Sequence, residues 1–140
     1  MKLYVNIDGG SRGNPGKGAA AMVITDETGR ILATKSKYLG DEVTNNYAEW
    51  SALAGAVKAL LSLNRRYGSI DAEIRSDSRL VVQQFKGEFK IKSVELREIA
   101  RSVWQALEGK KDMRIEVIHV PREENRLADA AVNRELDKYK

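Results

Sequence analysis

The sequence of 140 residues contains no cysteine, only one histidine and two prolines. Without cysteine the chain can form neither disulfides nor thiolate metal sites, so a reducing compartment suits it. Long apolar runs are also missing, since the stretches GAAAMVI and ALAGAV are far too short to cross a bilayer. The N-terminus enters a strand pattern at once and lacks the layout of a signal peptide. We therefore expect a cytoplasmic protein without a membrane partner.

The residues that are present are typical of a soluble globular chain. Hydrophobic residues make up 42% and charged residues 31% of the sequence, and its length suffices for a proper core. We expect a single domain over residues 1–140. The 24 basic residues exceed the 20 acidic ones, giving a net charge of +4. This excess is a mild indication of a polyanionic partner.

Hydrophobic periodicity predicts the element order βββαβααβα. The predicted strands are residues 2–8, 18–25, 30–38, 72–77 and 113–120, and the predicted helices are 47–63, 78–87, 93–108 and 125–137. Because helices connect them, the first, fourth and fifth strands should run parallel, with the second antiparallel to its neighbours. The expected fold is an α/β fold, a mixed five-stranded sheet in the order 3-2-1-4-5 flanked by helices.

Four carboxylates from distant parts of the chain fall near one edge of this sheet. Asp8 and Asp77 end the first and fourth predicted strands, Glu49 lies early in the first helix, and Asp129 lies on the last helix. Ligands of such sheets bind at the carboxyl ends of the parallel strands, so we expect these four side chains to converge. A set of oxygen ligands favours Mg²⁺ or Mn²⁺ over zinc.

Each of these acids also has an ordinary structural explanation. Glu49 could complement the helix macrodipole. Asp77, like Ser78, could cap the helix that follows. Asp129 is four residues after Asn125, so the two could form an exposed polar stripe.

The glycine-rich segment DGGSRGNPG at residues 8–16 resembles a phosphate-binding loop at first sight. Its glycines lack the dinucleotide spacing and precede a strand instead of a helix, and a P-loop would need glycine where Ser11 stands, six residues before Lys17. The segment instead indicates a turn between antiparallel strands, with glycines supplying positive φ. That interpretation leaves Asp8 unexplained.

Four stretches of the chain closely resemble type I ribonuclease H. They are YVNIDGGSRGNPG (4–16), TNNYAEWSAL (44–53), IRSDSRLVV (74–82) and HVPREENRLADAAV (119–132), and they follow the family's order over nearly the whole chain. The resemblance implies the ribonuclease H-like fold and places the family's four catalytic acids on Asp8, Glu49, Asp77 and Asp129. Agreement at all four positions argues against four separate structural explanations.

The resemblance also implies a reaction, the endonucleolytic hydrolysis of the RNA strand of an RNA–DNA hybrid. In the family's two-metal mechanism one Mg²⁺ or Mn²⁺ ion activates a water and the other stabilises the departing 3′ oxygen, leaving 5′-phosphate and 3′-hydroxyl ends. Asp8 would bridge the two ions. Double-stranded RNA stays open as a further substrate, whereas a non-catalytic binding module would gain nothing from clustered acids. We expect a monomer.

The resemblance assigns substrate contacts to two loops. The matching positions are Gly10, Ser11, Asn14, Asn45 and Asn46. Their backbone and side-chain amides would contact the minor groove, where RNA displays its 2′-hydroxyls. For Asn45 a helix N-cap is an equal alternative. Three lysines, Lys86, Lys90 and Lys92, form a basic strip that would follow the DNA phosphates or simply be solvated.

The chain departs from many bacterial relatives in two places. A long basic insertion is replaced by the short GEFKIKS, and no histidine-bearing flexible loop precedes the last helix. His119 alternates with apolar neighbours and is predicted to be a strand residue. Arg122 is the better candidate for the loop's role, as a permanent cation that steadies the scissile phosphate. Helical spacing predicts that one inner face of the helix over 93–108 carries Val94, Ile99, Val103, Trp104 and Leu107. Trp50 and Trp104 could stack on sugars, but aromatic residues in helices are more often core residues, and Trp104 is expected in the core.

Overall fold

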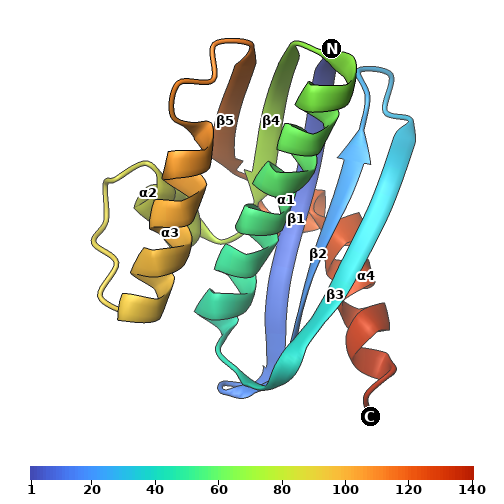
Figure 1. Ribbon diagram of the computed structural model, residues 1–140. Coiled ribbons are helices and arrows are strands. Elements are labelled where there is room, and N and C mark those ends of the chain that lie inside the picture. The colour runs from blue at the N-terminus through green and yellow to red at the C-terminus, as the bar shows by residue number, and fades with distance from the viewer.

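The computed structural model describes residues 1–140 and folds them into one five-stranded sheet with helices on both faces (Figure 1). The strands are β1 (Lys2–Gly13), β2 (Gly16–Thr25), β3 (Ile31–Val43), β4 (Ile70–Ser76) and β5 (Met113–His119), and the helices are α1 (Asn45–Tyr67), α2 (Arg79–Phe85), α3 (Val94–Leu107), the 3-10 turn η1 (Arg122–Glu124) and α4 (Arg126–Asp137). The strand order β3-β2-β1-β4-β5 confirms the predicted sheet. None of the helices combines the length and hydropathy of a bilayer-spanning segment.

The main core lies between the sheet and α1. In β1 the buried residues Leu3, Val5 and Ile7 alternate with partly exposed ones, as a strand with one buried face requires. The facing stripe of α1 recurs at helical spacing and consists of Leu53, Ala56, Val57 and Leu60. A smaller cluster on the opposite face holds α4 against β2. These two layers fix α1 and α4 on either side of β1.

Strand β1 runs five residues further than predicted and contains most of the glycine-rich segment. Its pairing with β2 continues from Gly9–Ala20 to Gly13–Gly16, so the turn itself consists of Asn14 and Pro15. Asp8 therefore lies within the strand, and the prediction that it ends the strand was wrong. The parallel pairing with β4 does stop beside it, at Ile7 and Ser76. Glycines carry no side-chain periodicity, which is why the pattern understated this strand.

The glycines of this segment serve close packing more than turn geometry. Among them only Gly13 has a positive φ, at 97°, so the expectation of positive φ holds at this one position. At Gly9 a Cβ would lie 2.3 Å from the carbonyl carbon and oxygen of Ala48 in α1. Gly9 thereby allows the backbone of α1 to approach β1 directly beside Asp8.

The inner face of α3 agrees with the predicted one at Val103, Ile99 and Leu107 and differs from it at Val94 and Trp104. Leu96, Ala100 and Val103 are buried, whereas Val94 is 64% and Trp104 41% exposed. The buried stripe follows the spacing i, i+4, i+7, which leaves Trp104 at its margin, where its indole Nε1 donates to the carbonyl of Phe85 at 3.1 Å. The prediction of a core Trp104 was therefore wrong. Trp50, by contrast, is fully buried as predicted, with its indole N–H bonded to Gln84.

Candidate active site

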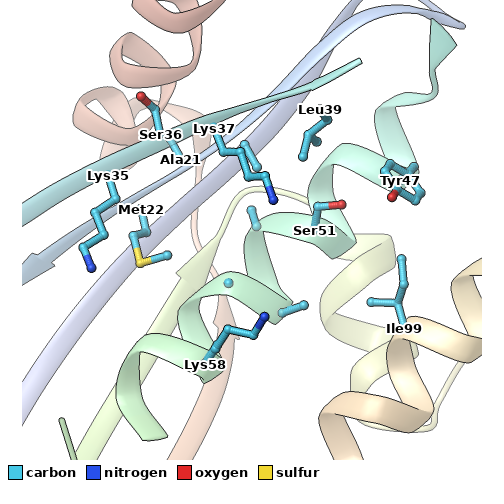
Figure 2. A pocket seen from close by; sticks show the side chains of 14 residues that line it. Ala21, Met22, Lys35, Ser36, Lys37, Leu39, Tyr47, Ser51, Lys58 and Ile99 are labelled. Carbon is cyan, nitrogen blue, oxygen red and sulfur yellow. The ribbon is translucent and has the colours of Figure 1, made fainter. Parts of the chain in front are cut away.

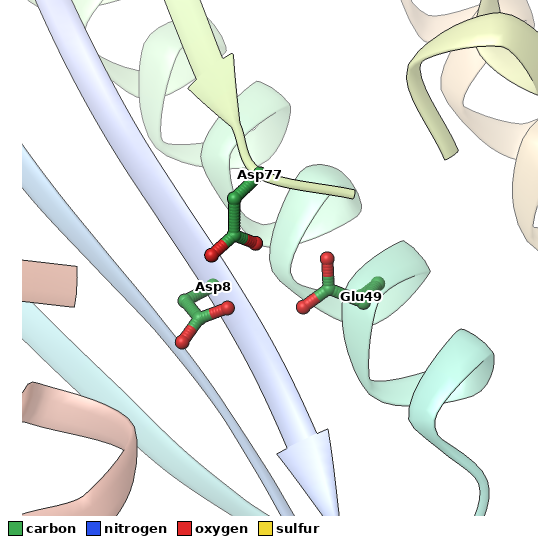
Figure 3. A group of neighbouring side chains, drawn as sticks. All are labelled: Asp8, Glu49 and Asp77. Atoms are coloured by element: carbon green, nitrogen blue, oxygen red, sulfur yellow. The ribbon is translucent and has the colours of Figure 1, made fainter. Parts of the chain in front are cut away.

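Asp8, Glu49 and Asp77 meet beside the point where β1 and β4 separate (Figure 3). A carboxylate oxygen from each residue lies within 4.8 Å of an oxygen from each of the other two. Asp8 is contributed by β1, Glu49 by the start of α1, and Asp77 by the residue after β4. Asp8 and Glu49 are only 7% and 8% exposed, and Asp77 is half-buried. Three acids from separate segments thus share one small volume.

Local contacts explain how Glu49 reaches this cluster. Thr44 caps α1 by accepting a hydrogen bond from the N–H of Tyr47 at 3.1 Å, which sets the start of the helix. The glycine contact described above brings the helix against β1. The N–H of Gly9 then donates to Oε1 of Glu49 at 2.6 Å. Glu49 is buried against the sheet and lies outside the first turn of α1, so the macrodipole does not account for it.

Asp77 is not needed as a helix cap. The hydroxyl of Ser78 accepts from the N–H of Val81 at 3.4 Å and caps α2. The capping explanation for Asp77 is therefore wrong, and its carboxylate points toward Asp8 and Glu49 (Figure 3).

Asp129 joins the other three acids in the wall of a cleft of about 470 Å³. It lies in the first turn of α4, whose start is tied to β1 by the side chain of Asn125. The Asn125 amide donates to the carbonyl of Ile7 at 2.8 Å and its Oδ1 accepts from Asn6 at 3.0 Å. Asn125 is 1% exposed, so the proposed polar stripe was wrong for this residue. Sequence reasoning missed this positioning role. The signal for it was an asparagine at the start of a predicted helix, within one of the four stretches that resemble the family.

Burial raises the pKa of both Asp8 and Glu49. For Asp8 the loss of hydration is the largest cause and the charge of Asp77 the next. For Glu49 the loss of hydration is again the largest cause, followed by the charge of Asp8. Without a cation the pair therefore retains a proton into the neutral range. A divalent ion would relieve the same repulsion, and a purely carboxylate donor set fits Mg²⁺ or Mn²⁺.

Hydrogen bonds link three of the predicted substrate-binding residues, Ser11, Asn14 and Asn45. Gly10, Ser11 and Asn45 line the cleft. Oδ1 of Asn45 accepts from the N–H of Ser11 at 2.9 Å, and the N–H of Asn45 donates to Oδ1 of Asn14 at 3.0 Å. Asn45 is thus the first residue of α1 rather than its cap, and that alternative was wrong. Asn14 and the half-buried Asn46 lie outside the cleft lining.

The cations near the cleft come from two elements. Arg122 of η1 lines the cleft, as does Arg12 of β1. Sequence reasoning did not single out Arg12, because the segment that contains it was interpreted as a turn. Arg12 pairs with Asp137 of α4 at 2.8 Å. His119 is the last residue of β5, which confirms it as a strand residue, and it lies outside the cleft lining. The three lysines of the basic strip are exposed and also lie outside it.

The sheet order and the carboxylate cluster beside β1 and β4 define the ribonuclease H-like class of α/β domain. A family model described as reverse transcriptase-like matches residues 6–135. Ribonuclease HI of Halobacterium salinarum is 37% identical over 97% of this chain. The structure of LC11-RNase H1 in complex with an RNA/DNA hybrid matches with a TM-score of 0.89 at 36% identity, covering 98% of both chains. The chain belongs to the type I ribonuclease H family.

Several relatives are longer than this chain. It spans 65% of the Halobacterium salinarum protein and 36% of the bifunctional protein Rv2228c of Mycobacterium tuberculosis, to which it is 36% identical. The N-terminal RNase H domain of the mycobacterial protein matches with a TM-score of 0.86 at 31% identity, covering 99% of this chain and 95% of that one. What the chain shares with these relatives is therefore the α/β domain described above.

Proposed function

We propose that this chain hydrolyses the RNA strand of RNA–DNA hybrids as a metal-dependent endonuclease, leaving 5′-phosphate and 3′-hydroxyl ends. The observation that carries the proposal is the convergence of Asp8, Glu49 and Asp77 in a largely buried cluster. Such a cluster is costly without a cation and would repel a polyanion on its own. A relative of 36% identity has been solved with an RNA/DNA hybrid bound, which supports this substrate.

The four acids Asp8, Glu49, Asp77 and Asp129 would hold two divalent ions, Mg²⁺ or Mn²⁺. When bound, such ions supply an activated water and stabilise the leaving oxygen. The chain contributes the positioning of these ligands. The N–H of Gly9 orients Glu49, and Asn125 anchors the helix that presents Asp129.

Arg122 would place a permanent positive charge near the scissile phosphate. Its guanidinium cannot act as a base, so it would bind and orient the phosphate rather than move a proton. The linked residues Ser11, Asn14 and Asn45, with Gly10 and Asn46, would contact the minor groove, and Glu49 would lie near the 2′-hydroxyls displayed there. The hydrogen bonds between the two loops would hold these groups in place before the substrate arrives.

Four finer proposals concern the second substrate, the domain organisation, the oligomeric state and the location of the protein. Double-stranded RNA also displays 2′-hydroxyls in a wide minor groove, so it is a second substrate to test. Residues 1–140 would act as one domain and as a monomer. Size-exclusion chromatography with light scattering measures the oligomeric state. A cytoplasmic location is compatible with the absence of cysteine, and fractionation of cells that produce the chain tests it.

The decisive experiment incubates the protein with end-labelled hybrid, RNA duplex and DNA duplex in Mg²⁺ or Mn²⁺. We expect the RNA strand of the hybrid to be cut internally and the DNA duplex to stay intact. Asp8→Asn is the control and should abolish cleavage. Cleavage that survives this substitution, or a hybrid that remains uncut in both metals, would overturn the proposal.

A further inference from the structure

A second groove of about 480 Å³ lies away from the carboxylates, between β3 and α1 (Figure 2). Its floor is largely apolar and includes Met22 of β2, Leu39 of β3 and Ile99 of α3. Two exposed lysines of β3, Lys35 and Lys37, stand on one side of it. Exposed Lys58 of α1 stands on the other side. Figure 2 shows Lys37 and Lys58 extending into the groove from opposite sides.

These three lysines have no counter-charge in the chain. No acidic residue lines the groove, and none of the three takes part in the ion pairs of the structure. Like charges that converge without a partner repel each other and favour an anionic ligand. The groove therefore carries a net positive charge that no neighbouring acidic residue neutralises.

The depth of the groove depends on Gly55. A Cβ at this position in α1 would lie 3.3 Å from Cε of Met22, so a larger side chain would fill the floor. A nucleic-acid backbone would satisfy the lysines but would leave this apolar floor without a matching group. An acidic peptide segment that carries an apolar side chain covers both features, with carboxylates on the lysines and the apolar group on the floor.

We propose that this groove binds an acidic segment of a partner protein, with an apolar side chain on its floor and carboxylates on its lysines. The groove uses the face of α1 that carries Ser51 and Lys58, whereas Glu49 projects from the opposite face toward β1. The segment would bind without entering the carboxylate cleft. This site is separate from the proposed nuclease function and does not depend on it.

Fluorescence anisotropy with a labelled octapeptide of alternating Asp and Leu tests the proposal. We expect saturable binding that weakens about tenfold or more in the double variant Lys37→Glu, Lys58→Glu, because two attractive charges become repulsive. The matched control is Lys110→Glu, Lys111→Glu, which makes the same charge change at exposed positions outside the groove and should leave the affinity unchanged.

A second variant separates the groove from general electrostatic attraction. Gly55→Leu keeps every lysine but fills the floor, so it should also abolish binding, and thermal unfolding checks that it folds. Peptides with Asn for Asp, or with Ser for Leu, should both bind at least about tenfold more weakly. Three results would overturn the proposal. They are equal affinities for the Ser and Asp–Leu peptides, a loss of affinity in the Lys110 and Lys111 control as large as in the Lys37 and Lys58 variant, and no binding of the Asp–Leu peptide. Displacement of the Asp–Leu peptide by single-stranded DNA would assign the groove to nucleic acid instead.

Discussion

Asp8→Asn should make the metal-free protein more stable while it abolishes nuclease activity. Asp8 is 7% exposed and lies beside Glu49 and Asp77. In the absence of a cation, its negative charge is both poorly hydrated and repelled by its neighbours. Asparagine has nearly the same shape but carries no charge. The substitution therefore removes a cost that the folded protein bears only for the sake of its ligand site.

The pKa of Asp8 sets the size of this effect. Burial, with the charge of Asp77 as the second cause, raises the pKa of Asp8 from 3.8 to about 7. Between about pH 4 and pH 7 the folded state thus binds more protons than the unfolded state, so the free energy of unfolding falls as the pH rises through this window. At about 1.4 kcal/mol per pKa unit, the gain in the free energy of unfolding from Asp8→Asn has an upper bound of about 4 kcal/mol. Because Glu49 shares the proton and the Asn amide is itself buried, we expect about 1–3 kcal/mol at pH 8, or about 3–9 °C in Tm.

Thermal unfolding in EDTA, at about pH 5 and about pH 8, measures this effect. The gain in Tm should be large at the higher pH and small at the lower one, where the wild-type carboxyl is protonated. Asp112→Asn, an exposed aspartate between α3 and β5, is the matched control and should change little. Mg²⁺ should raise the Tm of the wild type and not that of Asp8→Asn, since ligand binding to the folded state stabilises it. A variant that is less stable than the wild type at pH 8, or equally stabilised at both pH values, would refute the reasoning.

Three other substitutions test how the site is held together. Gly9→Ala should lower the free energy of unfolding by about 3 kcal/mol or more, because its Cβ would collide with the α1 backbone. Gly10→Ala is the control and should be tolerated, since the nearest neighbour of its Cβ would lie at 3.9 Å. Equal urea midpoints for the two variants would contradict this. Asn125→Ala leaves the carbonyl of Ile7 without its donor and should lower the free energy of unfolding by about 2–4 kcal/mol. Calorimetry should also show weaker Mg²⁺ binding. Unchanged stability and unchanged metal affinity would contradict the positioning role of Asn125. Arg122→Ala should lower turnover on hybrid far more than His119→Ala, and the reverse order in steady-state kinetics would show that the assignment is wrong.

Local pattern was sufficient for much of the fold and for the choice of candidate acids. The alternation in β1 and the helical spacing of α1 were legible because each element has one buried face. The errors fall where that signal is weak. Glycines hid the continuation of β1 past Asp8. The predicted face of α3 was drawn too wide, because Trp104 lies about 100° around the helix from the buried Val103.

The sequence by itself determined the order of the elements, the strands that run parallel and the acids that share one edge of the sheet. Those properties follow from hydrophobic periodicity and chain connectivity, which are local. Only the tertiary structure decided how close the acids come to one another and how far they are buried from solvent. Those properties depend on contacts between distant segments, namely Gly9 against α1, Asn125 against β1, and the packing that removes water from Asp8 and Glu49. The groove between β3 and α1 arises in the same way, since its lysines lie far apart along the chain and meet only after the sheet and helix have packed.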